Sequence, residues 1–269
     1  MKTLFRVGLS LLVLAFILIG LSYSMLRAKG VSSPVSVTGR DLESVTRQVG
    51  AQVRVIDLNG PIDLTVRQGA TASLEVKGEQ RLLANIDTSS EGDTIHIGTT
   101  GMLLYHRQPL QVVLVLPALR EVHIRGDGDS TVNGFSGDAI DVRMEGRGTL
   151  KFNGRYSEVE ATVRGTGEVE MNGGASKKME ATLEGSGKLT VVGSSKELKA
   201  VLAGSGDFNA RHLKADIVDL TMMGSGSAIV NAATRFETSL RGSGDIAVYG
   251  NPQVREVNVN GSGSVSYKD

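Results

Sequence analysis

Apolar and polar residues alternate along most of the second half of the chain. In the segments 159–173, 198–210 and 236–250, every second residue is apolar, threonine or glycine. A period of two is typical of β-strands, because successive side chains point to opposite faces. These segments therefore predict strands that each bury one face.

A Gly-x-Gly motif lies within each of these segments, and eight copies follow one another at steps of 20, 19, 20, 19, 20, 18 and 19 residues. Because the glycines continue the inward-facing series, we expect each motif to form a tight inner corner between two strands, where glycine accommodates bends and close backbone approach. The predicted corner glycines are Gly126, Gly128, Gly146, Gly148, Gly165, Gly167, Gly185, Gly187, Gly204, Gly206, Gly224, Gly226, Gly242, Gly244, Gly261 and Gly263.

A fixed period near 20 residues predicts a stacked-repeat fold. One rung cannot bury its apolar side alone, whereas stacked rungs bury it together and pair each backbone with its neighbours. A lone Gly-Ser-Gly is typical of a flexible linker, but eight copies in one register favour ordered structure. We predict an all-β protein, a β-helix or β-solenoid, with about 19–20 residues per rung. Eight rungs spaced about 4.8 Å apart give a column of roughly 40 Å.

The pattern divides the chain into four parts. Residues 1–30 read as an N-terminal membrane anchor or signal segment, and residues 31–50 as a polar linker with an entry strand. Residues 51–121 alternate less regularly and predict irregular first rungs that cap the N-terminal end. The regular Gly-x-Gly rungs are expected over residues 122–269.

The N-terminal part carries a membrane-targeting pattern. The run from Val7 to Leu26 is uncharged and mostly apolar, and lysine and arginine flank it on both sides. Twenty helical residues at about 1.5 Å each span a hydrocarbon core of roughly 30 Å. We expect an uncleaved transmembrane helix through residues 7–26, in a bacterial inner membrane with the β-helix in the periplasm. The alternative is a cleaved signal peptide, which leaves a periplasmic or secreted protein.

Three stretches of the chain carry a family resemblance. They are the segment Ile62–Gly69, the run from Val112 to Leu119, and the ending from Gly242 to Pro252. Over roughly residues 45–269 the chain resembles the bacterial head GIN domain family, whose members are called auto-transporter adhesins. This resemblance implies a right-handed β-helix in an envelope or surface protein.

The composition argues against several classes of function. Lysine plus arginine balances aspartate plus glutamate, 29 against 29, so the chain has no basic surplus for nucleic acid. Aromatic residues make up only 4%, which is few for stacking on bases. The absence of cysteine excludes disulfides, thiol catalysis and thiolate metal sites. The four histidines, which share no metal-ligand spacing, are His96, His106, His123 and His212. We predict no metal, no cofactor and no nucleic-acid partner.

The middle residue of each motif is expected to point outward. The simplest interpretation is a solvated ladder of small polar side chains. The alternative is a hydroxyl-lined stripe that binds an envelope protein or polysaccharide, formed by Thr166, Ser186, Ser205, Ser225, Ser243 and Ser262. Calcium is disfavoured, because calcium-binding β-rolls need a nine-residue repeat and the period here is about 19.

The sequence shows no catalytic constellation, and we predict a non-catalytic binding, adhesion or scaffolding module. It has no Ser-His-Asp order, phosphate loop or dinucleotide fingerprint. The alternative is a β-helix enzyme that acts on polysaccharide with clustered carboxylates and an arginine. Asp127 and Asp129 form the tightest acidic pair, and Arg147 follows one rung later.

The last rung, from Val257 to Tyr267, is followed by only two residues in this sequence. Unpaired strand edges pair with other chains unless they are blocked. We therefore expect this end to serve self-association or partner binding. The alternative is that Lys268 and Asp269 simply face water.

Overall fold

The structure of this chain is a computed structural model that describes residues 41–100 and 109–268, together with single positions between 12 and 24. Most of the predicted anchor or signal helix, residues 7–26, lies outside the described residues. Among the residues that are described, no helix is both long enough and apolar enough to span a membrane.

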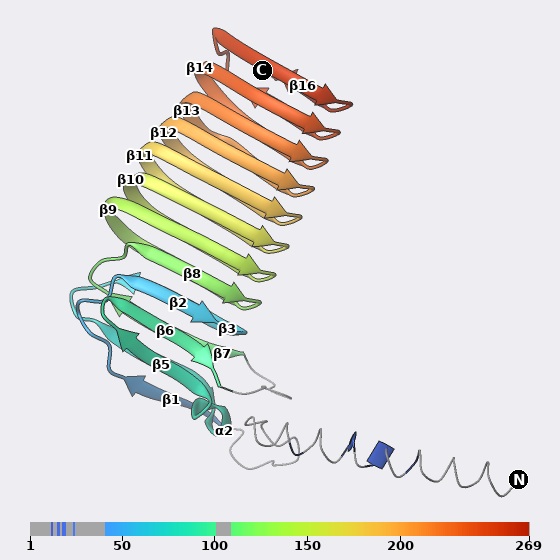
Figure 1. The fold of residues 1–269 in the computed structure, drawn as a ribbon. Helices are drawn as coiled ribbons and strands as arrows, with labels where there is room; N and C mark the ends of the chain where they lie inside the picture. Colours follow the sequence, from blue (N-terminus) through green and yellow to red (C-terminus); the bar gives the residue numbers. More distant parts are fainter. Residues whose placement is uncertain are drawn as a thin grey trace, which may run out of the picture.

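The described residues form an all-β solenoid, which confirms the predicted fold class. Figure 1 shows its strands stacked side by side in one column. The first glycine of each motif lies in register with the first glycine of the next motif on the neighbouring parallel strand, from Gly146 through Gly165 to Gly261. The regular strands are β9 (Asp129–Gly146), β10 (Thr149–Gly165), β11 (Glu168–Gly185), β12 (Lys188–Gly204), β13 (Asp207–Gly224), β14 (Ser227–Gly242), β15 (Asp245–Tyr249), β16 (Val254–Gly261) and β17 (Ser264–Tyr267).

Each regular rung has two sides, because the long strands bend midway. The bend appears as a shift of register, for example between Asn153 and Glu158 of β10 where it pairs with β11. The half-strand that follows a corner lies on one side of the column. The half-strand that precedes the next corner lies on the other side, which faces the viewer in Figure 1.

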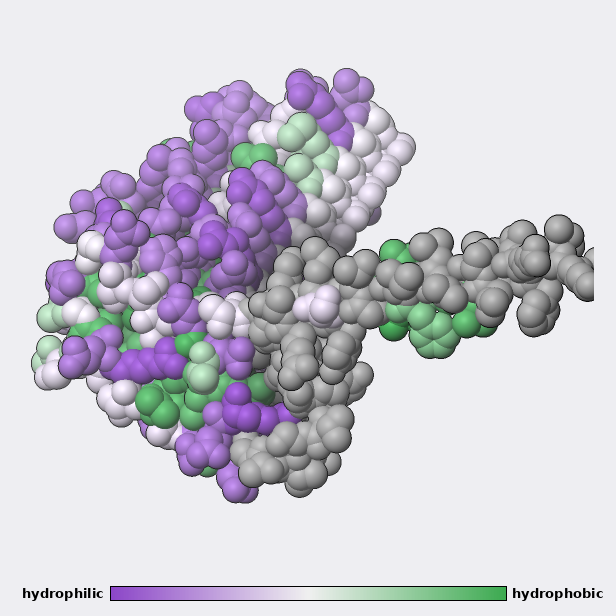
Figure 2. Space-filling model, turned by 60° about the horizontal axis from the view of Figure 1, so that its bottom comes forward, coloured by the Kyte–Doolittle hydropathy of each residue, from purple (hydrophilic) through white to green (hydrophobic). Residues whose placement is uncertain are grey.

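The first rungs are irregular and contain antiparallel strands. β1 pairs antiparallel with β4, β4 with β7, and β5 with β6. The elements are β1 (Leu42–Arg47), β2 (Val55–Asn59), β3 (Ile62–Gln68), β4 (Ser73–Glu79), α2 (Gln80–Leu83), β5 (Ile86–Glu91), β6 (Thr94–Thr99), β7 (Leu110–Leu116) and β8 (Glu121–Gly126). Figure 2 views this end of the column and shows hydrophilic residues over much of its surface, with apolar residues between them.

The order of the first rungs in space differs from their order along the chain. β2 pairs in parallel with both β6 and β8, and β3 pairs in parallel with both β7 and β9. The rung made by β2 and β3 therefore lies between the rung of β6 and β7 and the rung of β8 and β9. The Asn59-Gly60-Pro61 turn joins β2 to β3, so it is the corner of that inserted rung.

Apolar side chains from the two sides meet along the axis and form one core. On β10, for example, Leu150 and Val163 are fully buried. Burial of apolar surface stabilises the fold by about 25 cal/mol per Å², and each rung supplies the cover that its neighbours need. The buried Tyr156 fills the bend of β10 and donates a hydrogen bond to the Leu119 carbonyl oxygen at 3.0 Å.

Candidate functional site: the corners and the charged side

The Gly-x-Gly motifs occupy the corners where one strand ends and the next begins, along the edge marked by the arrowheads in Figure 1. A β-carbon on Gly204 would lie 2.3 Å from the Gly185 carbonyl oxygen, and one on Gly206 would lie 2.6 Å from the Gly187 oxygen. Both distances are far below van der Waals contact. Both motif positions therefore exclude side chains because the rungs stack backbone on backbone.

The two glycines of a motif differ in burial and in backbone conformation, and the first is not buried, although an inward position was expected for both. Gly206 is buried, whereas Gly204 is exposed and has a φ of 126°. A positive φ of this size is strained for a residue with a side chain. The first glycine is thus required by backbone conformation and by stacking, and the second by stacking alone.

The predicted hydroxyl stripe lies on the outside of these corners. Its six side chains are exposed, at Thr166, Ser186, Ser205, Ser225, Ser243 and Ser262. The backbone N–H of Ser205 donates to the Gly185 carbonyl oxygen at 2.9 Å, and four other stripe residues repeat this bond. The stripe is thus held in fixed register by the backbone, with its hydroxyl groups facing solvent.

The first two corners carry an ion pair in place of hydroxyls. Arg147 Nη2 lies 2.6 Å from Asp127 Oδ2, and both side chains are exposed. The hydrogen bond from Arg147 lowers the pKa of Asp127 below its ordinary value. Asp129 donates its backbone N–H to the Asp63 carboxylate at 2.9 Å. Of the predicted acidic pair Asp127 and Asp129, Asp127 therefore forms a surface ion pair with Arg147.

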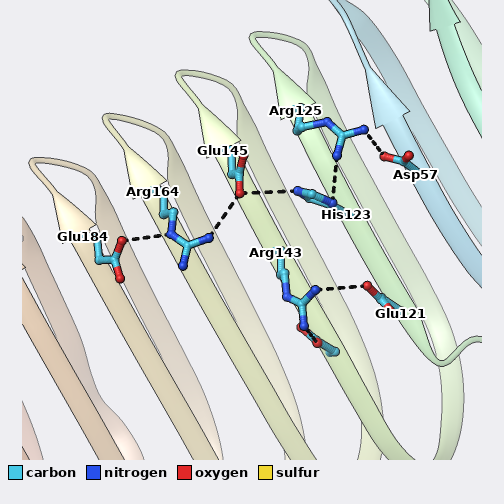
Figure 3. Close-up of polar contacts among 9 residues, drawn as sticks. Asp57, Glu121, His123, Arg125, Arg143, Glu145, Arg164 and Glu184 are labelled. Carbon is cyan, nitrogen blue, oxygen red and sulfur yellow. Dashed lines mark hydrogen bonds and ion pairs between the residues drawn. The ribbon is translucent and has the colours of Figure 1, made fainter.

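Next to the corners, on the side that precedes them, ionic side chains form a chain of contacts along the column (Figure 3). They come from six neighbouring strands, β6, β2, β8, β9, β10 and β11, whose order is given by the strand pairings. We call this set the charge ladder. Its members are His96, Asp57, His123, Arg125, Glu145, Arg164 and Glu184.

The charge ladder joins acidic and basic side chains at close range. Arg125 Nη2 lies 2.6 Å from Asp57 Oδ1, and its Nη1 donates to His123 Nδ1 at 3.2 Å. Arg164 lies 3.3 Å from Glu145 and 2.9 Å from Glu184. His123 Nε2 is buried and lies 3.5 Å from Glu145 Oε1, a contact that forms no hydrogen bond. These arginines are thus already paired with carboxylates of the same surface.

Further from the corner, five residues before the first glycine of the motif, four carboxylates stack on adjacent strands. The strand pairings place Glu121 of β8 beside Asp141, then Glu160, then Glu180 of β11. We call them the carboxylate column. Like charges directly opposite one another on neighbouring strands destabilise a sheet. The column is therefore a costly arrangement that nearby cations must offset.

Cations meet the carboxylate column at two points. Arg143 lies 3.3 Å from Glu121 and also hydrogen-bonds Asp141 (Figure 3). Lys178 lies 2.7 Å from Glu180. A pocket of about 280 Å³ opens at the column, and its lining includes all four carboxylates and Lys178.

Asp141 is the unusual member of the carboxylate column. Its Oδ1 atom is buried and has no hydrogen-bond partner among the described residues. Burial raises the pKa of Asp141 above its ordinary value, and the nearby Glu160 and Glu121 raise it further, whereas Arg143 opposes the shift. The arrangement favours a proton or a positively charged group at this carboxylate.

The carboxylate column was not predicted from the sequence, although a signal for it was present. Its members lie five residues before the first glycine of successive motifs, so their spacing follows the motif steps. Within residues 41–100 and 109–268, no three histidine, aspartate or glutamate side chains are placed to hold a metal ion. His106 lies outside the described residues.

A parallel β-solenoid with a fixed charged side and a hydroxyl stripe defines an extended repeat protein with a long, ordered polar surface. The chain belongs to the head GIN domain family. The family model, described as "Putative auto-transporter adhesin, head GIN domain", matches residues 52–252. The resemblance seen in the sequence is thereby confirmed, and membership favours a non-catalytic binding role.

Solved structures share the fold. A "putative adhesin" from Parabacteroides distasonis ATCC 8503 matches with a TM-score of 0.80 and 22% identity, over 85% of this chain and 97% of that one. A "putative adhesin" from Parabacteroides merdae ATCC 43184 matches with a TM-score of 0.79 and 19% identity, over 85% of this chain and 96% of that one. A "Putative lipid binding protein" from Parabacteroides distasonis ATCC 8503 matches with a TM-score of 0.79 and 19% identity, over 85% of this chain and 97% of that one. No curated protein matches the chain in sequence.

Proposed function

We propose that this chain is an exported, membrane-tethered binding or scaffolding module of the bacterial cell envelope. Residues 7–26 anchor it in the inner membrane, and the solenoid stands in the periplasm. The uncharged run from Val7 to Leu26 supports the anchor. The adhesin names of the family and of the similar structures support a binding role.

The observation that carries the proposal is the fixed pattern of charge on one side of the column. The carboxylate column and the charge ladder lie on paired strands, so a partner meets groups that are already ordered. Preorganised groups lower the entropy cost of binding. The partner is an envelope protein or polysaccharide, and the carboxylates of the exposed Glu160 and the half-buried Glu180 would contact its cationic or hydroxyl groups.

Crosslinking in intact cells, followed by capture of the tagged full chain, tests this proposal. We expect one envelope component to be enriched, and its capture to fall when Glu160→Lys and Glu180→Lys are combined. The control is Asp219→Lys, which reverses a charge in the same register on β13, outside the carboxylate column. Equal capture by the paired variant and the control would contradict the charged side as the contact.

A fusion reporter tests the topology separately. An alkaline phosphatase, which folds only outside the cytoplasm, is fused after Asp269 and should be active in intact cells. The chain should also remain with the membrane fraction. Activity confined to a cytoplasmic reporter, or release of the uncleaved chain as soluble protein, would contradict the tether.

The stacked carboxylates also favour a second candidate, a polysaccharide-acting enzyme. Asp141, whose pKa is raised by burial and which lies beside Arg143, would be the candidate general acid. The purified chain should then release new ends from acidic or neutral envelope polysaccharides, and Asp141→Asn should abolish release. The absence of products from a panel of such polymers, with binding retained, would favour the binding module.

A further inference from the structure

The C-terminal end of the column is built differently from the N-terminal end. β16 pairs with β14 and β17 pairs with β15, so within the described residues each has one free edge. Figure 1 shows β16 at the end of the stack. At the other end, antiparallel strands and α2 lie against the first rungs. Free parallel edges with the spacing of the column are a ready template for another chain.

The core is also open at this end. Val257 and Val259 occupy inward positions, opposite Thr238 and Leu240 of β14, yet they are 45% and 40% exposed. A further rung would cover them as each earlier rung is covered. The surface that matches both the free edges and these apolar positions is the same end of a second copy of this chain.

One residue breaks the apolar series at this end. Arg255 lies opposite Phe236 in an inward register position that is apolar and buried in every earlier regular rung. The buried residues of that position are Ile140, Val159, Met179, Leu198, Val218 and Phe236.

Arg255 is held across the open end by three contacts. Its guanidinium carbon lies 4.2 Å from the ring centroid of Tyr267, which comes from the opposite side of the rung. Its Nε donates to the Pro252 carbonyl oxygen at 3.0 Å, and its Nη2 donates to Asn251 Oδ1 at 2.9 Å. Tyr267 in turn packs edge-on against Phe236 at 6.4 Å. Tyr267, held by Arg255, therefore packs over Phe236 of the preceding rung, while Val257 and Val259 stay exposed.

We infer that Arg255 prevents a second copy of the chain from stacking on the C-terminal end of the solenoid. A second copy stacked on this end would bury a guanidinium that contacts no carboxylate within residues 41–100 and 109–268, and removing an unpaired charge from water is costly. An inward-pointing charge is a known means of blocking edge-to-edge pairing. A closed end is the opposite of the self-association expected from the sequence, and the two make different predictions for the wild-type protein.

Sedimentation of the full chain in detergent, over a range of concentrations, tests the inference. Wild-type protein should remain a monomer, whereas Arg255→Val should form dimers or larger species at the same concentrations. The matched control is Asn258→Val, which adds a valine to an outward position of the same strand and should stay monomeric. Adding Val257→Lys to Arg255→Val should restore the monomer.

Two results would overturn the inference. One is a folded, monomeric Arg255→Val protein at every concentration. The other is a wild-type protein that associates until Val257→Lys abolishes association, because the end would then be open despite Arg255. If Arg255→Val fails to fold by circular dichroism, Arg255→Gln removes the charge while keeping donors for Pro252 and Asn251, and the same expectation applies.

Discussion

Gly204 lies directly over Gly185, so close that a β-carbon on Gly204 would fall 2.3 Å from the Gly185 carbonyl oxygen. We expect Gly204→Ala to lower the free energy of unfolding by about 1–3 kcal/mol, through this clash and the strain of a positive φ. Ser205→Ala, at the exposed position between the two glycines, should change it by less than about 0.5 kcal/mol. Urea unfolding of both variants measures the difference, and equal effects would contradict the stacking explanation.

Asp141 should make the protein less stable as the pH rises. Its pKa is raised in the folded state, so the folded protein holds this proton in a range where the unfolded chain has released it. Stability from this group is full below the unfolded pKa near 4 and is lost as the pH rises through the folded pKa. The melting temperature of Asp141→Asn, minus that of wild type, should therefore increase from pH 4 to pH 7.

Asp127 provides the control of opposite sign for that experiment. Arg147 lowers its pKa, so its contribution is present at neutral pH and is lost as the pH falls through the folded pKa. Asp127→Asn should therefore reduce stability slightly at pH 7 and have no effect at low pH. The same trend for both variants would show that the two environments are not distinct.

Arg143 should be needed to hold the carboxylate column together. It contacts both Glu121 and Asp141, so Arg143→Met leaves stacked carboxylates without their counter-charge. We expect a loss of about 1–2 kcal/mol at pH 7 that shrinks on acidification, when the carboxylates become protonated. Arg241→Met, an exposed change on β14 with no ion pair among the described residues, is the control. A loss that is independent of pH would point to packing and not to charge.

Added calcium should leave the melting temperature unchanged. The regular rungs repeat every 18–20 residues, not every nine, and a ligand that binds only the folded state would raise the melting temperature. Magnesium at the same ionic strength is the control for general salt effects. A saturable rise at or below millimolar calcium would contradict this prediction.

Much of the regular half could be predicted from the sequence, because one alternation and one motif repeat at a nearly constant step. The reason for the motif was less accessible. Alternation alone predicts that both glycines face inward. Gly204 is exposed, and it must be glycine because a β-carbon there would clash with the Gly185 carbonyl oxygen of the neighbouring rung. The carboxylate column required the register to be applied to polar positions, which carry no alternation signal of their own.

The first rungs could not be ordered from the sequence. The insertion of β2 and β3 between later strands depends on long-range pairing, which local patterns do not encode. The Arg255 cap was missed for a related reason. A charged residue near a terminus reads as solvent-facing unless its register position relative to Phe236 is known.

The inserted rung of β2 and β3 bears on how the chain folds. The hydrogen bond between Asp63 and Asp129 of β9 links residues 66 positions apart in the sequence. Contacts between neighbouring regular rungs, such as that of Arg164 with Glu184, link residues about 20 positions apart. Closing the longer loop costs more chain entropy, and contacts distant in sequence form more slowly. The repeated half can propagate by short steps, while the N-terminal half must wait for β8 and β9 before β2 and β3 have both partners. The rate-limiting event is therefore expected at the junction of the two halves, where Gly126 is stacked on Gly60.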